Sequence, residues 1–180
     1  MPLHAELIEE IEVGPSGPHI GAFFDLDQTL IATFSMFEFF REGLRSGFMG
    51  LSDVGQAVAT ITQFQLGQIS FARFVTRMTG VLKGRSEDEL AEVGERIFHE
   101  RLAAEVYPEA RALVAAHRRK QHTVAIVSAS TPYQAHPLAA DFGIPHVLCT
   151  QLQVRNGKFT GRLVQPTCYG EGKAIHARRL

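Results

Sequence analysis

The stretch Ile20–Leu30 has the sequence IGAFFDLDQTL, and it decides the fold class of this chain. Its first five residues are small or apolar, and the apolar run ends abruptly at Asp25. Such a run is typical of a short buried strand in a parallel sheet, with polar chemistry at its carboxyl end. In an open α/β sheet, ligands bind just beyond the carboxyl ends of the strands. We therefore expect Asp25 and Asp27 to lie at a ligand-binding edge.

Two further apolar runs predict the other strands of this sheet. They occupy residues 123–127, followed directly by Ser128, and residues 146–149. Segments with helical character, one of which begins near Pro108, separate the runs. This alternation predicts an α/β fold with a parallel sheet and right-handed crossovers.

Local residue chemistry marks the ends of several elements. Thr131–Pro132 is typical of a helix start, because threonine caps the first turn and proline suits the first helical position. Gly143 is a typical helix stop, and Asn156–Gly157 predicts a two-residue hairpin turn. A last helix is expected to begin after Lys173.

A long helical block separates the first strand from the second. Apolar residues recur at helical spacing through residues 36–101, and Ser86 with Glu89 forms a capping box inside this block. A block of this length is an insertion rather than a simple crossover. We predict an N-terminal tail (1–19), a core domain (20–35 and 102–180) and a helical cap (36–101), with breakers at 14–18 between tail and core.

The composition of the 180 residues indicates an ordinary packed domain, because 45% are hydrophobic and 21% charged. With 18 basic and 19 acidic residues, nothing indicates a nucleic-acid partner. Two cysteines, Cys149 and Cys168, are too few for a disulfide framework or a zinc site. The sequence shows neither a secretory signal nor a membrane span, so we expect a cytoplasmic protein.

Asp25 and Asp27 are the first candidate catalytic pair. A carboxylate can attack phosphorus and form an acyl-phosphate, which divides a difficult hydrolysis into two easier steps. A second carboxyl group can protonate the leaving oxygen and later deprotonate the attacking water. The two side chains point oppositely if the strand continues and can converge if the chain turns. The alternative is that Asp25 is only a cap or turn residue.

Two more residues follow predicted strands or begin helices. Ser128, with the backbone N–H groups after it, precedes a helix start and could cradle a phosphate. Lys173 could neutralise phosphate oxygens and the charge of a nucleophile. Each has a structural alternative: Ser128 as part of an ordinary strand-to-helix turn, and Lys173 as a solvated helix residue.

Taken together, these segments resemble a known family. Phe23–Leu30, Ile126–Ser128 and Gly172–Lys173 are similar to motifs one, two and three of the haloacid dehalogenase superfamily. Their spacing is similar to that of the phosphoserine-phosphatase-like group, which has a helical cap between motifs one and two. The resemblance runs from Ile20 to the end. It implies a Rossmann-like parallel core with a helical (C1) cap after the first strand and an incomplete C-terminal part.

The resemblance also implies the role of each motif residue in a phosphatase that cleaves a small phosphorylated metabolite. It implies that Asp25 is the nucleophile, that Asp27 is the general acid and base, and that Lys173 neutralises charge. The carboxylate of Asp25 and the backbone carbonyl of Asp27 are implied ligands of Mg²⁺. The implied ligands of the substrate phosphate are Thr29, Ser128, Ala129 and Lys173.

A narrower resemblance and two departures qualify these expectations. Residues 21–25, 107–109, 122–128 and 166–173 resemble actinobacterial proteins in which such a domain precedes a 1-acylglycerol-3-phosphate acyltransferase domain. The family's fourth motif, an acidic pair that completes the metal site, is expected beyond Leu180, so we interpret the chain as truncated. Residues 1–180 alone are therefore expected to bind Mg²⁺ weakly and to show little activity.

The second departure concerns the substrate. Phe34 stands where related phosphatases use a cap glutamate to hold the amine of serine, and Arg77 is one residue from the expected carboxylate-binding arginine. Phosphoserine is therefore not the expected substrate. Five apolar residues either line a pocket for a less polar substrate or form the cap core: Phe34, Met36, Phe37, Phe39 and Phe40.

Two rival functions stay open on the sequence alone. The first is a catalytically incomplete domain with a regulatory or interaction role. The second is a phosphotransferase or phosphonatase on the same scaffold, which only product analysis separates from a phosphatase.

Overall fold

The computed structural model describes residues 2–47 and 50–180, and its core is a three-stranded parallel sheet. The strands lie in the order β1 (Gly21–Phe24), β2 (Thr123–Ser128) and β3 (His146–Cys149). The register pairs Phe24 with Ile126 and Ser128 with Cys149. The predicted α/β fold is confirmed, and Asp25 and Ser128 lie at the carboxyl ends of neighbouring strands.

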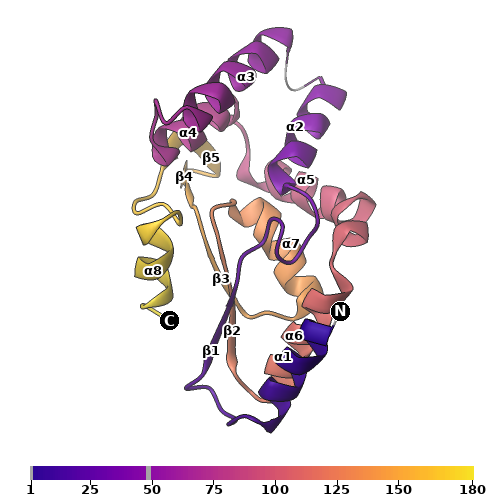
Figure 1. Cartoon of the computed structure of the whole chain (residues 1–180). Coiled ribbons are helices and arrows are strands. Elements are labelled where there is room, and N and C mark those ends of the chain that lie inside the picture. The colour runs from indigo at the N-terminus through magenta and orange to yellow at the C-terminus, as the bar shows by residue number, and fades with distance from the viewer. Residues whose placement is uncertain (1, 48–49) are drawn as a thin grey trace.

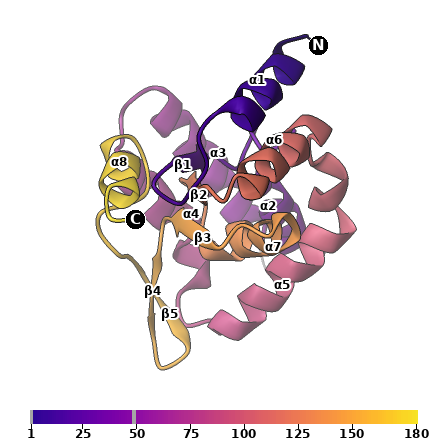
Figure 2. The same cartoon turned by 90° about the horizontal axis from the view of Figure 1, so that it is seen from below.

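Helices cover both faces of this sheet. Helices α6 (Pro108–Arg119) and α7 (Pro132–Phe142) lie on one face, and α8 (Glu171–Ala177) lies on the opposite face (Figure 1, Figure 2). Side chains alternate along the strands, so Val124 and Ile126 join the large buried cluster on the α6–α7 face. A smaller buried cluster of Ala125, Val127 and Cys168 lies on the α8 face.

The local signals in the sequence are found where they were predicted. Thr131 caps α7, Pro132 is its first residue, and Gly143 ends it in the left-handed conformation with φ of 64°. Strands β4 (Leu152–Arg155) and β5 (Lys158–Leu163) form an antiparallel hairpin. Its turn has φ of 53° at Asn156 and 70° at Gly157, because asparagine and glycine tolerate the left-handed region.

Residues Pro2–Val13, which we assigned to an N-terminal tail, form helix α1. This helix packs against α6, and Ile8 and Ile11 are half-buried. Glu12 forms an ion pair with Arg119, and its carbonyl accepts a hydrogen bond from Lys120 Nζ at 3.0 Å. The segment is therefore attached to the core by both apolar and polar contacts.

The inserted helical segment, residues 35–105, precedes α6, and its helices α2 to α4 lie beyond the carboxyl ends of the strands (Figure 1). In the described part of the chain, no helix has the length and apolar character needed to cross a membrane. The segment consists of four α-helices and two short 3-10 turns: α2 (Ser35–Arg45), α3 (Leu51–Gln65), α4 (Phe71–Met78), η1 (Gly80–Leu82), α5 (Glu87–Glu100) and η2 (Leu102–Glu105).

A buried carboxylate joins α2 to α5. Glu42 is only 3% exposed, and Arg45 contacts both of its oxygens at 2.9 and 3.0 Å. Arg96 and Arg101 donate to the same carboxylate at 3.2 and 3.1 Å. The hydrogen bonds and charge of Arg45, with those of Arg96 and Arg101, lower the pKa of Glu42 from 4.5 to about 2. The charged form is therefore stabilised in the folded state.

The stability of the fold should depend on pH through this residue. Because the pKa of Glu42 is lower in the folded than in the unfolded chain, its contribution is present above pH 4.5 and is lost as pH falls toward 2. Glu42→Gln should remove that part of the dependence and lower the free energy of unfolding by roughly 1.5–3 kcal/mol at neutral pH. Urea unfolding from pH 2 to 7 measures both. Glu95→Gln, which removes an exposed carboxylate of α5, should change neither; equal effects of the two variants would contradict the role of Glu42.

Candidate active site

The chain turns sharply after β1, and this turn presents Asp25 and Asp27. Leu26 is fully buried, and its carbonyl accepts hydrogen bonds from the N–H groups of the three residues 29–31. Gln28 has φ of 58°, in the left-handed region. Because the strand ends at Phe24, its alternation does not force the two carboxylates to opposite faces. The sequence left open whether the strand continues through Asp27 or the chain turns there, and in the structure the chain turns.

Asp25 is paired with Lys173. Lys173 Nζ contacts Asp25 Oδ2 at 2.6 Å, and the N–H of Leu26 donates to Asp25 Oδ1 at 2.8 Å. Helix α8 begins at Glu171, so Lys173 lies in its first turn, whereas we expected the helix to begin after this lysine. The side chain of Asp25 is 41% exposed, so a substrate can reach it. The structure thus joins the first and third sequence motifs across 148 residues.

The backbone before Lys173 allows this pairing because residue 172 has no side chain. A Cβ atom at Gly172 would lie 1.9 Å from the carbonyl oxygen of Thr167. The backbone N–H of Gly172 donates to Tyr169 O at 2.9 Å, which holds the loop in a tight turn. Only glycine therefore fits without displacing either the Thr167 carbonyl or α8.

Gly172→Ala should displace α8 or the Thr167 carbonyl and weaken the contact between Lys173 and Asp25. We expect a loss of roughly 1–3 kcal/mol in the free energy of unfolding, the usual effect of overpacking. The matched control is Gly55→Ala in α3, where an added Cβ meets nothing within 4 Å. That control should be neutral or stabilising, since alanine favours a helix more than glycine does. Thermal unfolding measures the midpoints of the two variants. Equal midpoints would contradict the expected clash at Gly172, because the Thr167 carbonyl would then have moved away without loss of stability.

Asp27 is held by residues of two other segments. Its Oδ1 accepts from the N–H of Ser35 at 2.8 Å, and its Oδ2 accepts from Ser130 Oγ at 3.1 Å. Gln134 Nε2 donates to Ser35 Oγ at 3.0 Å, and Gln134 Oε1 accepts from the N–H of Thr131 at 2.7 Å. This network ties the turn after β1 to the starts of α2 and α7. It fixes the orientation of the Asp27 carboxyl group.

Burial raises the pKa of Asp27 above 3.8, and the hydrogen bonds from Ser35 and Ser130 oppose that shift only in part. The negative charge of nearby Asp25 raises the pKa of Asp27 further. The group therefore keeps its proton to higher pH than an ordinary aspartic acid. That property suits a general acid, which must be protonated before it can act.

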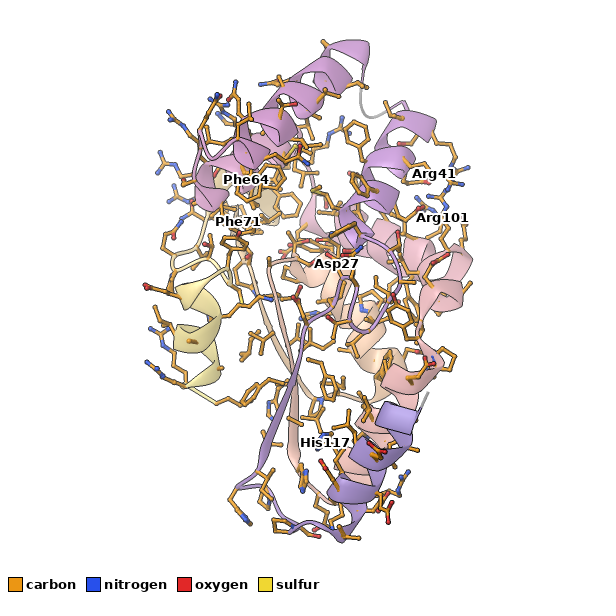
Figure 3. The ribbon with its side chains drawn as sticks, in the orientation of Figure 1. Asp27, Arg41, Phe64, Phe71, Arg101 and His117 are labelled. Carbon is orange, nitrogen blue, oxygen red and sulfur yellow. The ribbon has the colours of Figure 1, made fainter. Side chains whose placement is uncertain are left out.

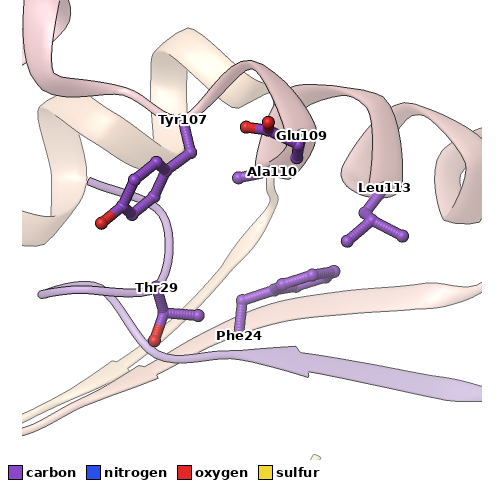
Figure 4. A pocket seen from close by; sticks show the side chains of 6 residues that line it. All are labelled: Phe24, Thr29, Tyr107, Glu109, Ala110 and Leu113. Carbon is purple, nitrogen blue, oxygen red and sulfur yellow. The ribbon is translucent and has the colours of Figure 1, made fainter. Parts of the chain in front are cut away.

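The predicted phosphate ligands lie in different places. Ser128 is 1% exposed, and its Oγ accepts from the N–H of Ser130 at 3.2 Å, while Ala129 lines a cavity that also reaches Asp27. Thr29 instead lines a second cavity of about 420 Å³, beside Phe24 and Tyr107 (Figure 4). The turn at 26–31 thus places Asp27 and Thr29 in the walls of different cavities. Their roles toward phosphate stay predictions.

Three residues of the Asp27 network were not among the candidates from the sequence, and one of them is Ser130, which donates directly to Asp27. Ser35 is fully buried and Gln134 is 7% exposed, and both are polar. The only local signal was the spacing of Thr131 and Gln134, three residues apart, which is typical of a capping box. That spacing indicates a helix start, and nothing in it indicates that the glutamine also reaches Ser35.

The larger cavity, of about 480 Å³, lies between Asp27 and the cap helices. Figure 3 shows Asp27 below the helices that carry Phe64 and Phe71. Phe71 also stacks on Tyr169, with ring centroids 4.0 Å apart, so the cap contacts the loop that leads to Lys173. The cavity therefore joins Asp27 to the apolar interior of the cap.

The site offers oxygen ligands rather than nitrogen or sulfur. The Asp25 carboxylate and the Asp27 carbonyl are hard oxygen donors, which suit Mg²⁺ with waters in its remaining positions. Over residues 2–47 and 50–180, no three His, Cys, Asp or Glu side chains cluster as a complete metal centre. The donor set fits a magnesium ion held by few protein ligands.

Comparison with known proteins agrees with this geometry. A family model described as haloacid dehalogenase-like hydrolase matches residues 22–180. A probable phosphatase of Mycobacterium tuberculosis is 32% identical over 164 residues, which are 88% of this chain and 56% of that protein. A phosphoserine phosphatase of the same organism is also 32% identical over 164 residues, covering 88% of this chain and 53% of its own length. The chain thus spans little more than half of these relatives.

Solved structures share the fold. A protein of unknown function from Bordetella pertussis superposes with a TM-score of 0.80 at 24% identity, over 89% of this chain and 72% of its own. A hydrolase of the same family from Salmonella enterica superposes with a TM-score of 0.67 at 22% identity, over 92% and 53% of the two chains. At these identities the likeness concerns the fold alone. Because the family model matches residues 22–180, this chain belongs to the haloacid dehalogenase-like hydrolases.

Proposed function

We propose that this chain carries the catalytic core of a Mg²⁺-dependent phosphomonoester hydrolase that works through a phosphorylated Asp25. The observation that carries the proposal is the pairing of an accessible Asp25 with Lys173 at 2.6 Å, next to an Asp27 whose pKa is raised by burial. A nucleophile, a cation and a carboxyl group whose pKa is raised are, in one place, parts that phosphoryl transfer uses. Phosphatases among the relatives support the same reaction class.

In the first step, a carboxylate oxygen of Asp25 attacks phosphorus and forms an acyl-phosphate bond. The P–O bond to the alcohol breaks, and the carboxyl group of Asp27 gives its proton to the leaving oxygen. Ser35 and Ser130 stabilise the carboxylate that Asp27 becomes, because both donate to its oxygens. Lys173 reduces the repulsion between the Asp25 carboxylate and the phosphate.

In the second step, water attacks the phosphorus of the acyl-phosphate, and the bond to Asp25 breaks. Asp27, now a carboxylate, takes a proton from that water and returns to its initial state. Asp25 regains its carboxylate, and inorganic phosphate leaves. Magnesium, held by the Asp25 carboxylate and the Asp27 carbonyl, would supply positive charge between the two anions. Ser128 and Ala129 are the proposed ligands of the phosphate oxygens, whereas Thr29, another candidate from the sequence, lines the other cavity.

The direct test is to trap the phosphorylated intermediate in the full-length protein. After incubation with Mg²⁺ and a phosphate monoester, rapid denaturation and borohydride reduction should convert a phosphorylated Asp25 into homoserine. Peptide mass spectrometry then locates the modified position. Modification at another acidic residue, or phosphate release without any trapped residue, would contradict the proposed nucleophile.

Three finer points of the proposal rest on the sequence: a small phosphorylated metabolite as substrate, a cytoplasmic location, and an acyltransferase domain in the same protein. The resemblance of residues 21–25, 107–109, 122–128 and 166–173 supports the last of these. The full coding sequence tests the domain, and a tagged protein tests the location.

A further inference from the structure

Aromatic rings dominate the wall of the larger cavity. Phe64 and Phe74 stack with centroids 4.7 Å apart, and Phe71 stacks on Tyr169. Phe34 and Phe37 line the same cavity, although 43% and 51% of their surfaces remain exposed. The rings thus surround a hollow rather than fill it, and its volume of about 480 Å³ lies in the range of roughly 300–1,000 Å³ typical of small-molecule sites. Of the two interpretations that the sequence left open, these contacts favour the pocket.

The cavity lining also carries very little charge. Among the lining residues that the structure describes, Asp27 is the one ionisable side chain. Ser130, Thr131 and Gln134 add polar groups at the same end as Asp27, and Gln65 and Thr79 of the cap add neutral polar groups elsewhere in the lining. Arg77, which is one residue from the position expected for a carboxylate-binding arginine, donates to Gln63 Oε1 at 2.6 Å on an exposed face of the cap. A substrate carboxylate inside the cap would meet aromatic rings and no basic side chain of the lining, and an unpaired anion in such surroundings is strongly disfavoured.

From this polarity we infer that the cavity binds the organic group of an apolar alcohol, so that the substrate is an alkyl or aryl phosphate monoester without a carboxylate on its alcohol part. In this arrangement Asp25 and Lys173 hold the phosphate next to the polar end that Asp27 lines, and the hydrocarbon extends between the aromatic rings of α2, α3 and α4. This inference rests on the proposed function, because it names the substrate class of the same site. It separates this chain from a phosphoserine phosphatase, whose substrate carries two charges on its alcohol part.

The test uses a homologous series of phosphate esters and the complete protein. Ethyl, butyl, hexyl and octyl phosphate are compared with O-phosphoserine, all below micelle-forming concentrations, by phosphate release with Mg²⁺. Each added methylene should raise kcat/KM about fourfold until the chain fills the cavity, since burial of apolar surface drives binding. O-phosphoserine should not exceed ethyl phosphate. A flat series, or O-phosphoserine as the best substrate, would overturn the inference.

A matched pair of variants assigns the effect to this cavity. Phe34→Glu places a carboxylate at its wall, and the ratio of octyl to ethyl phosphate kcat/KM should fall about tenfold or more. Leu66→Glu adds the same charge at the end of α3, at a residue that is 66% exposed and outside the lining. That ratio should stay as in the parent protein. An unchanged ratio in Phe34→Glu would place the hydrocarbon elsewhere.

Binding measurements keep the two proposals distinguishable. Alkylphosphonates of the same chain lengths are not hydrolysed, and calorimetric titration reports their affinity without turnover. If no ester is cleaved, the proposed function fails, and the length dependence of phosphonate affinity decides the inference by itself. If esters are cleaved with no length dependence in either assay, the proposed function stands and the apolar substrate class is wrong.

Discussion

Asp25→Asn should abolish the hydrolysis of p-nitrophenyl phosphate by the complete protein. An amide cannot supply the attacking oxygen anion, so turnover should fall by several orders of magnitude, on the order of 10³-fold or more. The fold should persist, because Asp25 is partly exposed and its pair with Lys173 resembles a surface ion pair, worth about 0–1 kcal/mol. Phosphate release under saturating substrate, with circular dichroism as a check on folding, measures the effect.

The matched control is Asp88→Asn, which removes an exposed carboxylate in the first turn of α5. It should retain parental turnover. If Asp25→Asn kept more than about a tenth of that turnover, well above what loss of a nucleophile permits, Asp25 would not be the nucleophile.

Asp27→Asn should lower turnover by roughly 10²–10⁴-fold, the usual contribution of general acid–base catalysis. The structure allows asparagine to replace aspartate with little rearrangement. Its amide oxygen can accept from the N–H of Ser35, and its NH₂ group can donate to Ser130 Oγ, so both contacts of the carboxyl group have a substitute. The loss should therefore be chemical rather than structural.

The leaving group distinguishes this role from a merely structural one. A nitrophenolate leaves without a proton, whereas an alkoxide needs one, so the variant should lose much less activity on p-nitrophenyl phosphate than on alkyl phosphates. The parent protein should also lose activity as pH rises through the raised pKa of Asp27, and that loss should be absent from the variant. Equal losses on both esters would contradict Asp27 as the acid.

The cap cavity also decides which alkyl ester is suitable for the Asp27→Asn experiment. If the hydrocarbon binds between the aromatic rings, a short alkyl phosphate shows the role of Asp27 against a low parental rate. Octyl phosphate is therefore the better alkyl ester for the comparison. With octyl phosphate, substitutions at Phe34 and Phe37 should raise KM more than they lower kcat, because these rings contact the hydrocarbon and not the reacting phosphate.

The elements that the sequence predicted correctly depend on local chemistry. Thr131–Pro132 starts α7, Gly143 ends it in the left-handed conformation, and Asn156–Gly157 forms the hairpin turn. Each depends on the backbone preferences of one or two residues, which are the same in any tertiary setting. The apolar run before Ser128 likewise predicted β2, because a strand buried on both faces needs continuous apolar sequence. The run before Asp25 predicted β1, although this strand lies at the edge of the sheet and leaves Phe23 48% exposed.

Contacts between distant segments were decided by the tertiary structure alone. Ser130 meets Asp27 across 103 residues, Arg101 meets Glu42 across 59, and Gln134 meets Ser35 across 99. No periodicity or turn residue encodes such distances, since they depend on how the crossovers bring segments together. The same holds for the volume of the cap cavity and for Thr29, which a single turn moved to another side. The sequence by itself therefore determined the fold class and the candidate catalytic residues, while packing decided their partners, the raised pKa of Asp27 and the apolar space beside it.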